Sequence, residues 1–186
     1  GFDFYAPQTM EGPKGRRILV GWLGMGEVEY PTDKNGWAHC LTLPRELSIE
    51  NGRIIQKPLK ELESLRRKEY RVKDEACDEI KAYDELKGIT YELIGEFKNH
   101  DAEEFGIEFR ASEEEKTVIK YDSLQKKLIL DRSVSGEEFG QEYGNVRACD
   151  FQGDSIKFHL FVDVSSVEIF INDGAEVFTS RIFPKK

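Results

Sequence analysis

Apolar residues alternate with other residue types in several short stretches of the C-terminal part of the chain. The longest stretch has apolar side chains at every second position, Ile156, Phe158, Leu160 and Val162. A period of two is typical of a strand that buries one face. Turn residues separate such stretches about every 8 to 12 residues, a spacing typical of sandwiches. We therefore predict roughly seven short strands, forming an antiparallel β-sandwich over residues 68–186.

Residues 1–57 also predict extended structure, interrupted by Gly and Pro. A short apolar run, Ile18–Trp22, lies between Gly15 and Gly24. Further along, Asn51-Gly52 separates two runs and is a strong signal for a two-residue hairpin turn. These residues therefore predict one sheet of about three or four strands and no helix. Such a sheet needs a partner surface that buries its apolar face.

Residues 58–67 differ in pattern from both parts. Leu59, Leu62 and Leu65 recur at a spacing of three, and Pro58 precedes them. This spacing predicts a short amphipathic helix with proline at its start. We therefore expect an all-β chain in three parts: a sheet at 1–57, a linker helix at 58–67 and the sandwich at 68–186.

The chain of 186 residues is acidic, with 27 Lys and Arg against 36 Asp and Glu, a net charge of −9. A nucleic-acid or anionic-membrane partner is not expected, because no basic stripe remains to neutralise phosphates. The basic residues between Lys57 and Arg71 are interleaved with Glu61, Glu63 and Glu69, which favours a solvated surface. No apolar run approaches the length of a membrane span.

Cysteines are few, and their spacing indicates no metal site. Cys40, Cys77 and Cys149 are far apart and odd in number. Because no pair has the spacing of a zinc site, we predict neither a metal nor another cofactor. Buried, reduced thiols are the expected state, which favours a cytoplasmic location.

Four phrases occur in order near the start of the chain: FYAPQT at 4–9, GWLG at 21–24, YPT at 30–32 and LTLPREL at 41–47. Together they resemble glycoside hydrolase family 32, the invertases and sucrose-6-phosphate hydrolases. Two later phrases, LDRS at 130–133 and DVSSVEIF at 163–170, are similar to the family's sandwich. The resemblance implies the last blade of a five-bladed β-propeller followed by a β-sandwich, with most of the propeller missing.

The catalytic carboxylates of that family have no counterpart in this sequence. A retaining glycosidase uses two carboxyl groups about 5–5.5 Å apart, one as nucleophile and one as general acid/base. In the family they lie in WMNDPNG-like and EC motifs, and a further Asp lies in an RDP motif. None of these motifs occurs here, and Asp150 follows Cys149 in the wrong order. No catalytic residue is therefore assigned, and the chain by itself is expected to be inactive.

Other polar residues of the predicted sandwich are expected to be structural. Asp131-Arg132, and Asp163 with Arg181, predict ion pairs and turn anchors inside the sandwich. A triad of Ser165 with His159 and Asp163 lacks the glycine-flanked turn that presents a serine nucleophile. The strand pattern also directs His159 outward, which argues against such a triad.

Asp3, Tyr5 and Trp22 are the candidate substrate-binding residues. A carboxylate and a phenol near an indole suit a sugar, which presents hydroxyl groups and an apolar ring face. By resemblance, Trp22 and the FYA phrase lie toward the funnel where fructose binds, with Asp3 and Tyr5 on the same rim. The alternative interpretation is that Trp22 and Tyr5 pack in the core of the blade.

The sequence leads to two alternative hypotheses about function. The first is the C-terminal portion of a β-fructofuranosidase, which in its intact form would hydrolyse sucrose, sucrose-6-phosphate or other fructosides through a covalent fructosyl-enzyme without a metal. The second is a stand-alone, lectin-like sandwich that binds carbohydrate or a partner, although its aromatics alternate inward. In either case the sheet at 1–57 has uncovered strand edges, which predicts self-association through it or packing against the sandwich.

Overall fold

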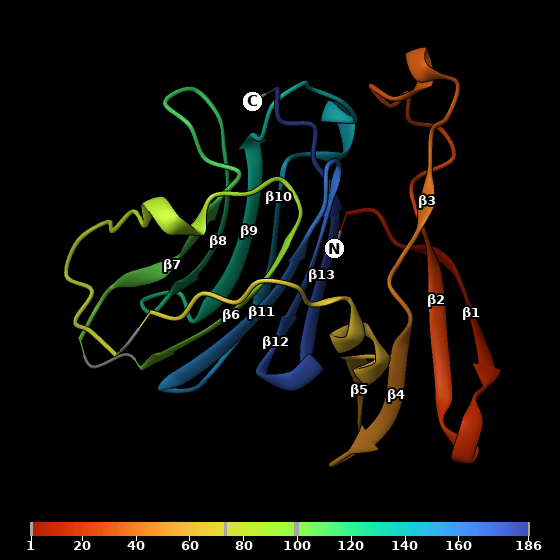
Figure 1. Cartoon of the computed structure of the whole chain (residues 1–186), viewed down its shortest axis with the longest axis horizontal. Coiled ribbons are helices and arrows are strands. Elements are labelled where there is room, and N and C mark those ends of the chain that lie inside the picture. Colours follow the sequence, from red (N-terminus) through yellow and green to blue (C-terminus); the bar gives the residue numbers. More distant parts are fainter. Residues whose placement is uncertain (1, 73, 99–100, 186) are drawn as a thin grey trace.

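The computed structural model describes residues 2–72, 74–98 and 101–185, and these form three antiparallel sheets (Figure 1). The strands of the first sheet are β1 (Tyr5–Glu11), β2 (Arg17–Leu23), β3 (Cys40–Leu41), β4 (Arg45–Glu50) and β5 (Arg53–Pro58). The others are β6 (Tyr91–Lys98), β7 (Glu104–Phe109), β8 (Lys116–Asp122), β9 (Lys127–Val134), β10 (Val146–Asp150), β11 (Ser155–Val162), β12 (Ser166–Ile171) and β13 (Glu176–Arg181). Short 3₁₀-helices lie between them: η1 (Pro13–Gly15), η2 (Asp33–Asn35), η3 (Lys60–Leu65), η4 (Asp84–Leu86), η5 (Gln141–Tyr143) and η6 (Asn172–Gly174).

The C-terminal part is an antiparallel β-sandwich, as the alternating pattern predicts. Its two sheets have the strand orders β10-β9-β8-β7 and β13-β12-β11-β6, so it has eight strands where about seven are predicted. The alternating residues of β11, from Ile156 to Val162, are at most 2% exposed and belong to one core shared by both sheets. The predicted buried face is therefore confirmed, and the fold is all-β.

The first sheet has the strand order β1-β2-β4-β5, with the two-residue β3 paired to β2. β4 and β5 form the hairpin that Asn51-Gly52 predicts. Both turn residues have positive φ, 52° and 76°, which is the backbone of a type I′ turn. The prediction of a single sheet is confirmed, and β3 raises its strand count to five.

The linker helix is present but belongs to the 3₁₀ class. η3 covers Lys60–Leu65, while Pro58 ends β5 instead of starting the helix. A repeat of three residues matches the 3₁₀ period of about 3.0 better than the α-helical period of about 3.6. The leucine spacing therefore also explains the helix type. Because Leu65 is 69% exposed, the leucines do not form a buried stripe.

The described residues between η3 and β6 contain no strand. Cys77 lies in this segment and is exposed, whereas Cys40 and Cys149 are half-buried. The prediction of a buried thiol is therefore wrong for Cys77, because no sheet covers this stretch. All three thiols are free, and burial raises the pKa of the Cys149 thiol to about 11.

The first sheet and its loops pack against the sandwich along a contact that we call the seam. In Figure 1 the hairpin β4-β5 stands beside β12 and β13, and β5 contacts η6. Phe2 reaches across the seam: its N–H donates to the carbonyl of Thr179 (2.8 Å), and its ring joins the sandwich core. The first sheet thus packs against the sandwich, which is one of the two arrangements that the sequence predicts for it; the other is self-association.

Candidate functional site

Trp22 lies near the end of β2 with its indole ring half-buried. The ring contacts Tyr5 and His39 edge-on, at centroid distances of 5.9 and 4.7 Å. The loop that follows passes close to the ring. A Cβ on Gly24 would lie 3.0 Å from the indole nitrogen, and one on Gly26 would lie 3.6 Å from Cη2. The loop therefore covers one part of the ring and leaves another part accessible.

Tyr5 lies directly opposite Trp22 on the neighbouring strand and is 63% exposed. A bulge interrupts the register between Tyr5 and Gln8, where Ala6 has a φ of 41°. Bulges re-aim side chains at functional edges of sheets. All residues of β1 are exposed, so Tyr5 is not core in this chain. Together with Trp22 it forms a small aromatic surface at the free edge of the first sheet.

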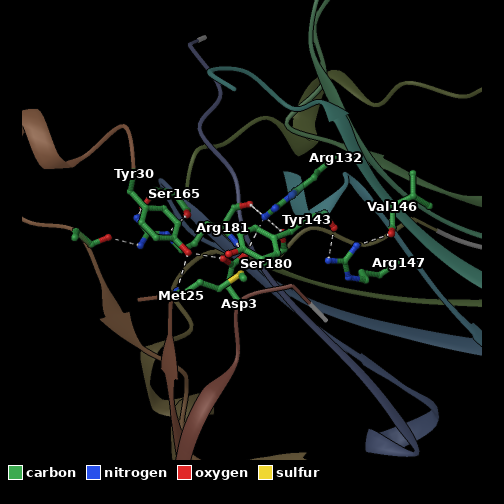
Figure 2. Close-up of polar contacts among 11 residues, drawn as sticks. Asp3, Met25, Tyr30, Arg132, Tyr143, Val146, Arg147, Ser165, Ser180 and Arg181 are labelled. Carbon is green, nitrogen blue, oxygen red and sulfur yellow. Dashed lines mark hydrogen bonds and ion pairs between the residues drawn. The ribbon is translucent and has the colours of Figure 1, made fainter. Parts of the chain in front are cut away.

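Asp3 is placed differently from these two rings, because it is fully buried in the seam. Its Oδ1 accepts a hydrogen bond from the hydroxyl of Tyr30 (2.7 Å). Its Oδ2 accepts from Arg132 Nη1 (2.9 Å) and from the backbone N–H of Arg181 (2.8 Å), as Figure 2 shows. Both oxygens are thus engaged by protein groups, and the structure gives Asp3 an anchoring role in the seam.

The contacts of Arg132 and Arg181 differ from the ion pairs that the sequence predicts inside the sandwich. Arg132 pairs with Asp3 across the seam, and its guanidinium lies 3.9 and 4.3 Å from the ring centroids of Phe2 and Phe139. Burial lowers the pKa of Arg132, and Asp3 opposes that shift. Arg181 donates to the carbonyls of Ser165 and Ala38, both at 2.9 Å. The expected pairing with Asp131 and Asp163 is wrong: the partner of Arg132 lies just before β1, and Arg181 donates to carbonyl oxygens instead of a carboxylate.

Tyr30 connects this buried carboxylate to the loop that covers Trp22. Its hydroxyl donates to Asp3 and accepts from the backbone N–H of Met25 (2.9 Å). Burial is the main cause that raises the pKa of Tyr30 above its usual value, and Asp3 adds to it, so the hydroxyl stays protonated. Sequence reasoning missed this role of Tyr30. The YPT phrase marks the position without indicating a partner.

A second buried pair, also missed from the sequence, crosses the seam beside the first. Arg45 Nη2 lies 2.5 Å from Glu168 Oε2 and donates to the hydroxyl of Thr179 (2.7 Å). The other oxygen of Glu168 accepts from the backbone N–H of Leu43 (2.6 Å). Burial raises the pKa of the Glu168 carboxyl, whereas Arg45 opposes that shift. The seam therefore has two buried ion pairs.

The described residues include no group of three or more His, Cys, Asp or Glu side chains that could hold a metal ion. The residues considered as a serine triad are engaged elsewhere. The hydroxyl of Ser165 accepts from Arg181 Nη2 (3.2 Å), and His159 Nε2 lies 2.6 Å from Glu92 Oε1. A nucleophile with an adjacent base is therefore not formed from these residues.

The sandwich itself offers little to a sugar. A hollow of about 250 Å³ on its surface is lined by Glu114, Glu115, Ser133, Val134, Gly136, Glu138 and Lys185. This lining has no aromatic ring to stack on a sugar face. Large rings such as Phe158 and Phe170 are fully buried instead. These features argue against a lectin-like sandwich.

Two family models match the chain and divide it near η3. The model described as "Glycosyl hydrolases family 32 N-terminal domain" matches residues 1–58. The model described as "Glycosyl hydrolases family 32 C terminal" matches residues 61–186. Separately, no helix among the described residues is long and apolar enough to cross a membrane.

Individual relatives agree with these models. A sucrose-6-phosphate hydrolase of Staphylococcus xylosus is 45% identical over 98% of this chain and 37% of that protein. The structure of a sucrose-6-phosphate hydrolase from Lactobacillus gasseri is similar over 100% of this chain and 37% of its own, with a TM-score of 0.87 and 32% identity. A substituted β-fructofuranosidase from Bombyx mori, in complex with sucrose, matches 99% of this chain and 36% of its own, with a TM-score of 0.76 and 30% identity. The chain thus spans a little over a third of such relatives.

Proposed function

Because the chain belongs to glycoside hydrolase family 32, we propose that it is the C-terminal portion of a β-fructofuranosidase of the sucrose-6-phosphate hydrolase type. The observation that carries this proposal is the match of both family models in succession, with the N-terminal model limited to residues 1–58. The first sheet is accordingly a blade remnant of the family's propeller, and residues 91–181 form its sandwich. We place the boundary at 58–67, where the two models also divide.

In this proposal the whole protein hydrolyses sucrose, sucrose-6-phosphate or related fructosides with retention, through a covalent fructosyl-enzyme. Sucrose-6-phosphate is the first choice, because the Staphylococcus and Lactobacillus relatives carry that name. The nucleophile and the general acid/base lie in the part of the protein outside this chain. This chain contributes one wall of the sugar site. Trp22 and Tyr5 contact the sugar, and Asp3 holds that wall from behind.

The first test is an activity assay of the 186-residue chain with sucrose and sucrose-6-phosphate. We expect no turnover above buffer, since binding surface without a nucleophile or acid provides no route through the retaining mechanism. Turnover by the purified chain would contradict the proposal that the catalytic groups lie outside it. Calorimetric titration of the same chain with fructose tests the lectin-like alternative. Binding with a sub-millimolar dissociation constant would favour that alternative.

The second test restores the missing part. The segment of the Staphylococcus xylosus enzyme that aligns with this chain is replaced by this chain, and we expect the chimera to hydrolyse sucrose-6-phosphate. Substituting Trp22→Ala in the chimera should lower kcat/KM about tenfold, the value of one aromatic contact. Tyr5→Ala should lower it less, and Tyr143→Ala is the matched control, an exposed tyrosine on the sandwich. A chimera that folds without activity, or equal effects of the two tyrosine substitutions, would contradict the proposal.

Two further properties belong to the same proposal. Free thiols at all three cysteines support a reducing, cytoplasmic location. The exposed edge strand β1 supports self-association of the isolated chain by strand pairing. Light scattering should then detect dimers or larger species, and Thr9→Lys on β1 should reduce them, because a charge on an edge strand opposes pairing. A monomer at all concentrations would contradict self-association.

A further inference from the structure

A row of aromatic rings runs without a break from the sandwich to Trp22. Phe183 contacts Phe139 at a centroid distance of 4.9 Å, and Phe139 contacts Tyr30 at 5.3 Å. Tyr30 contacts His39 at 5.1 Å, and His39 contacts Trp22 at 4.7 Å. Aromatic rings attract one another in edge-on and tilted arrangements at such distances. The orientation of Trp22 is therefore coupled by direct contact to the end of the sandwich.

A row of polar contacts also leads from the sandwich to the loop beside Trp22, and Figure 2 shows it from Arg132 through Asp3 and Tyr30 to Met25. Arg132 donates to Asp3, Asp3 accepts from Tyr30, and Tyr30 accepts from the N–H of Met25. Arg132 itself is 4% exposed and belongs to β9 of the sandwich. A buried polar group that loses its partner carries a large desolvation cost, so each member fixes the next. The row ends at the backbone of the loop that covers Trp22.

The loop has no room to adjust independently of Trp22. A Cβ on Gly24 would lie 2.5 Å from Cδ2 of His39 as well as 3.0 Å from the indole nitrogen. The loop backbone, His39 and Trp22 therefore form one close-packed unit. Tyr30 holds this unit twice, through its ring against His39 and through its hydroxyl at Met25.

We propose that Arg132 and Tyr30 are positioning residues for the sugar-contacting wall: the sandwich sets the orientation of Trp22 through Asp3, Tyr30 and the loop at Met25. The inference rests on the proposed function, because it gives the orientation of Trp22 a purpose in sugar binding. Neither residue touches the sugar in this scheme. Their effect is transmitted through the side chain of Tyr30 and the backbone of the loop.

The experiment reads Trp22 directly, without any sugar. The chain has two tryptophans, so Trp37→Phe leaves Trp22 as the single tryptophan, whose emission is selected by exciting at a wavelength that tyrosine does not absorb. In this background Tyr30→Phe retains the ring but removes the hydroxyl that joins Asp3 to Met25. We expect a red-shifted Trp22 emission and a larger acrylamide quenching constant. The amide of Met25 should exchange with solvent about fivefold faster, in line with the loss of one buried hydrogen bond.

The matched control is Tyr91→Phe, which removes the hydroxyl of a half-buried tyrosine on β6 of the sandwich, near the backbone of Arg110. Trp22 should not respond to this change. Arg132→Lys should produce part of the Tyr30→Phe response, since it keeps the charge but loses the planar contact with two rings. An unchanged Trp22 signal in Tyr30→Phe, or an equal response to Tyr91→Phe, would overturn the proposal. Because Tyr30→Phe keeps the packing, this test stands even if Arg132→Lys fails to fold.

The chimera separates this inference from the proposed function. There Tyr30→Phe should raise KM for sucrose-6-phosphate more than it lowers kcat, because it disturbs a binding surface and leaves the chemistry untouched. If Trp22→Ala leaves KM unchanged while Tyr30→Phe still alters Trp22 fluorescence, the sugar contact fails and the positioning role stands. If Trp22→Ala raises KM and Tyr30→Phe changes neither KM nor fluorescence, the positioning role fails and the contact stands.

Discussion

The sandwich and the first sheet are stabilised by different interactions. In the sandwich, residues from both sheets, such as Ile119, Leu160 and Ile169, are completely buried in one apolar core. The first sheet has few buried apolar residues, and its edge strand β1 has none. The most buried side chains of this part of the chain include Asp3, which precedes β1, and Arg45 on β4, and both pair with the sandwich across the seam.

This difference indicates which interactions keep the first sheet folded. Buried ion pairs contribute little net stability when intact, because removing charges from water is costly. They become strongly destabilising when one partner is lost, since the other charge remains buried. The first sheet should therefore be far more sensitive to one-sided loss of a seam charge than to loss of a surface charge.

Arg45→Ala should have the largest effect. It leaves the carboxylate of Glu168 buried without its partner, which costs about 3–5 kcal/mol in the free energy of unfolding. Urea denaturation of the chain measures this cost. Arg53→Ala is the matched control, because Arg53 also pairs across the seam, with Glu176, but is 64% exposed. It should stay within about 1 kcal/mol of the wild-type chain.

A double substitution that removes both charges of this pair separates the loss of the pair from the cost of leaving one charge buried. Replacing Arg45 and Glu168 together by Met should recover most of the stability lost in Arg45→Ala, because neither charge of this pair is then left buried without its partner. If Arg45→Ala costs no more than Arg53→Ala, the buried pair does not hold the first sheet. In that case the apolar contacts of the seam would be the dominant attachment.

Phe2→Ala should have the next largest effect, about 3–4 kcal/mol. The ring is 7% exposed in the sandwich core, and it also lies against the guanidinium groups of Arg132 and Arg147. Its loss opens a cavity next to a buried cation. Thermal and urea unfolding measure the cost, and Tyr5→Ala, an exposed aromatic on the next strand, should change stability by less than about 0.5 kcal/mol. Equal effects would show that Phe2 does not join the two parts.

Gly174→Ala should cost about 2–3 kcal/mol, because it forces β5 away from η6. The residue has a φ of +92°, and a Cβ there would lie 2.0 Å from the carbonyl oxygen of Gln56. The strain of a positive φ at a residue with a Cβ and the clash of that Cβ with the backbone of β5 add together at this position. Gly52→Ala is the control, with a φ of +76° and open space around its Cβ position, so it carries the backbone strain alone. Similar losses for both would mean that the seam can widen freely at η6.

Much of the fold could be predicted from the sequence, because strands and tight turns are local. The alternation from Ile156 to Val162 determines which face of β11 is buried, and Asn51-Gly52 determines the β4-β5 turn. The segment between η3 and β6 was harder to predict, since exposed irregular structure has no period. The leucine spacing at 59, 62 and 65 indicated a helix, while the 3₁₀ class became clear only from the structure.

The candidate site was predicted less completely, because partners across the seam are far apart in the chain. Asp3 and Arg132 are separated by 129 positions, and Arg45 and Glu168 by 123. A charged residue on a strand has the same sequence pattern whether it is solvated or paired in the interior. Tyr5 and Trp22 were identifiable as candidates through the FYAPQT and GWLG phrases. That Asp3 is buried in the seam and bonded to Arg132 and Tyr30 could not be inferred from its position next to Phe4.

The smallest expected effect concerns the linker, which is attached to the sandwich by a contact separate from the seam. Glu92 on β6 accepts from Arg66 Nε (2.6 Å) and lies 2.6 Å from His159 Nε2. Burial lowers the pKa of His159, although Glu92 opposes this, and Arg66 lowers the pKa of Glu92. Both groups therefore bind fewer protons in the folded than in the unfolded chain. Their contribution is present at neutral pH and is lost as pH falls, first below about 6.5 for His159.

Urea midpoints of the wild type and of His159→Gln, measured between pH 7.5 and 5, test this attachment. The wild type should lose stability on acidification over this range more steeply than the variant, which has no titrating ring at this position. Glu92→Gln removes the carboxylate that opposes the lowering of the His159 pKa, so it should steepen the same part of the profile. Identical pH profiles would mean that the contact between His159 and Glu92 does not contribute to stability over this pH range.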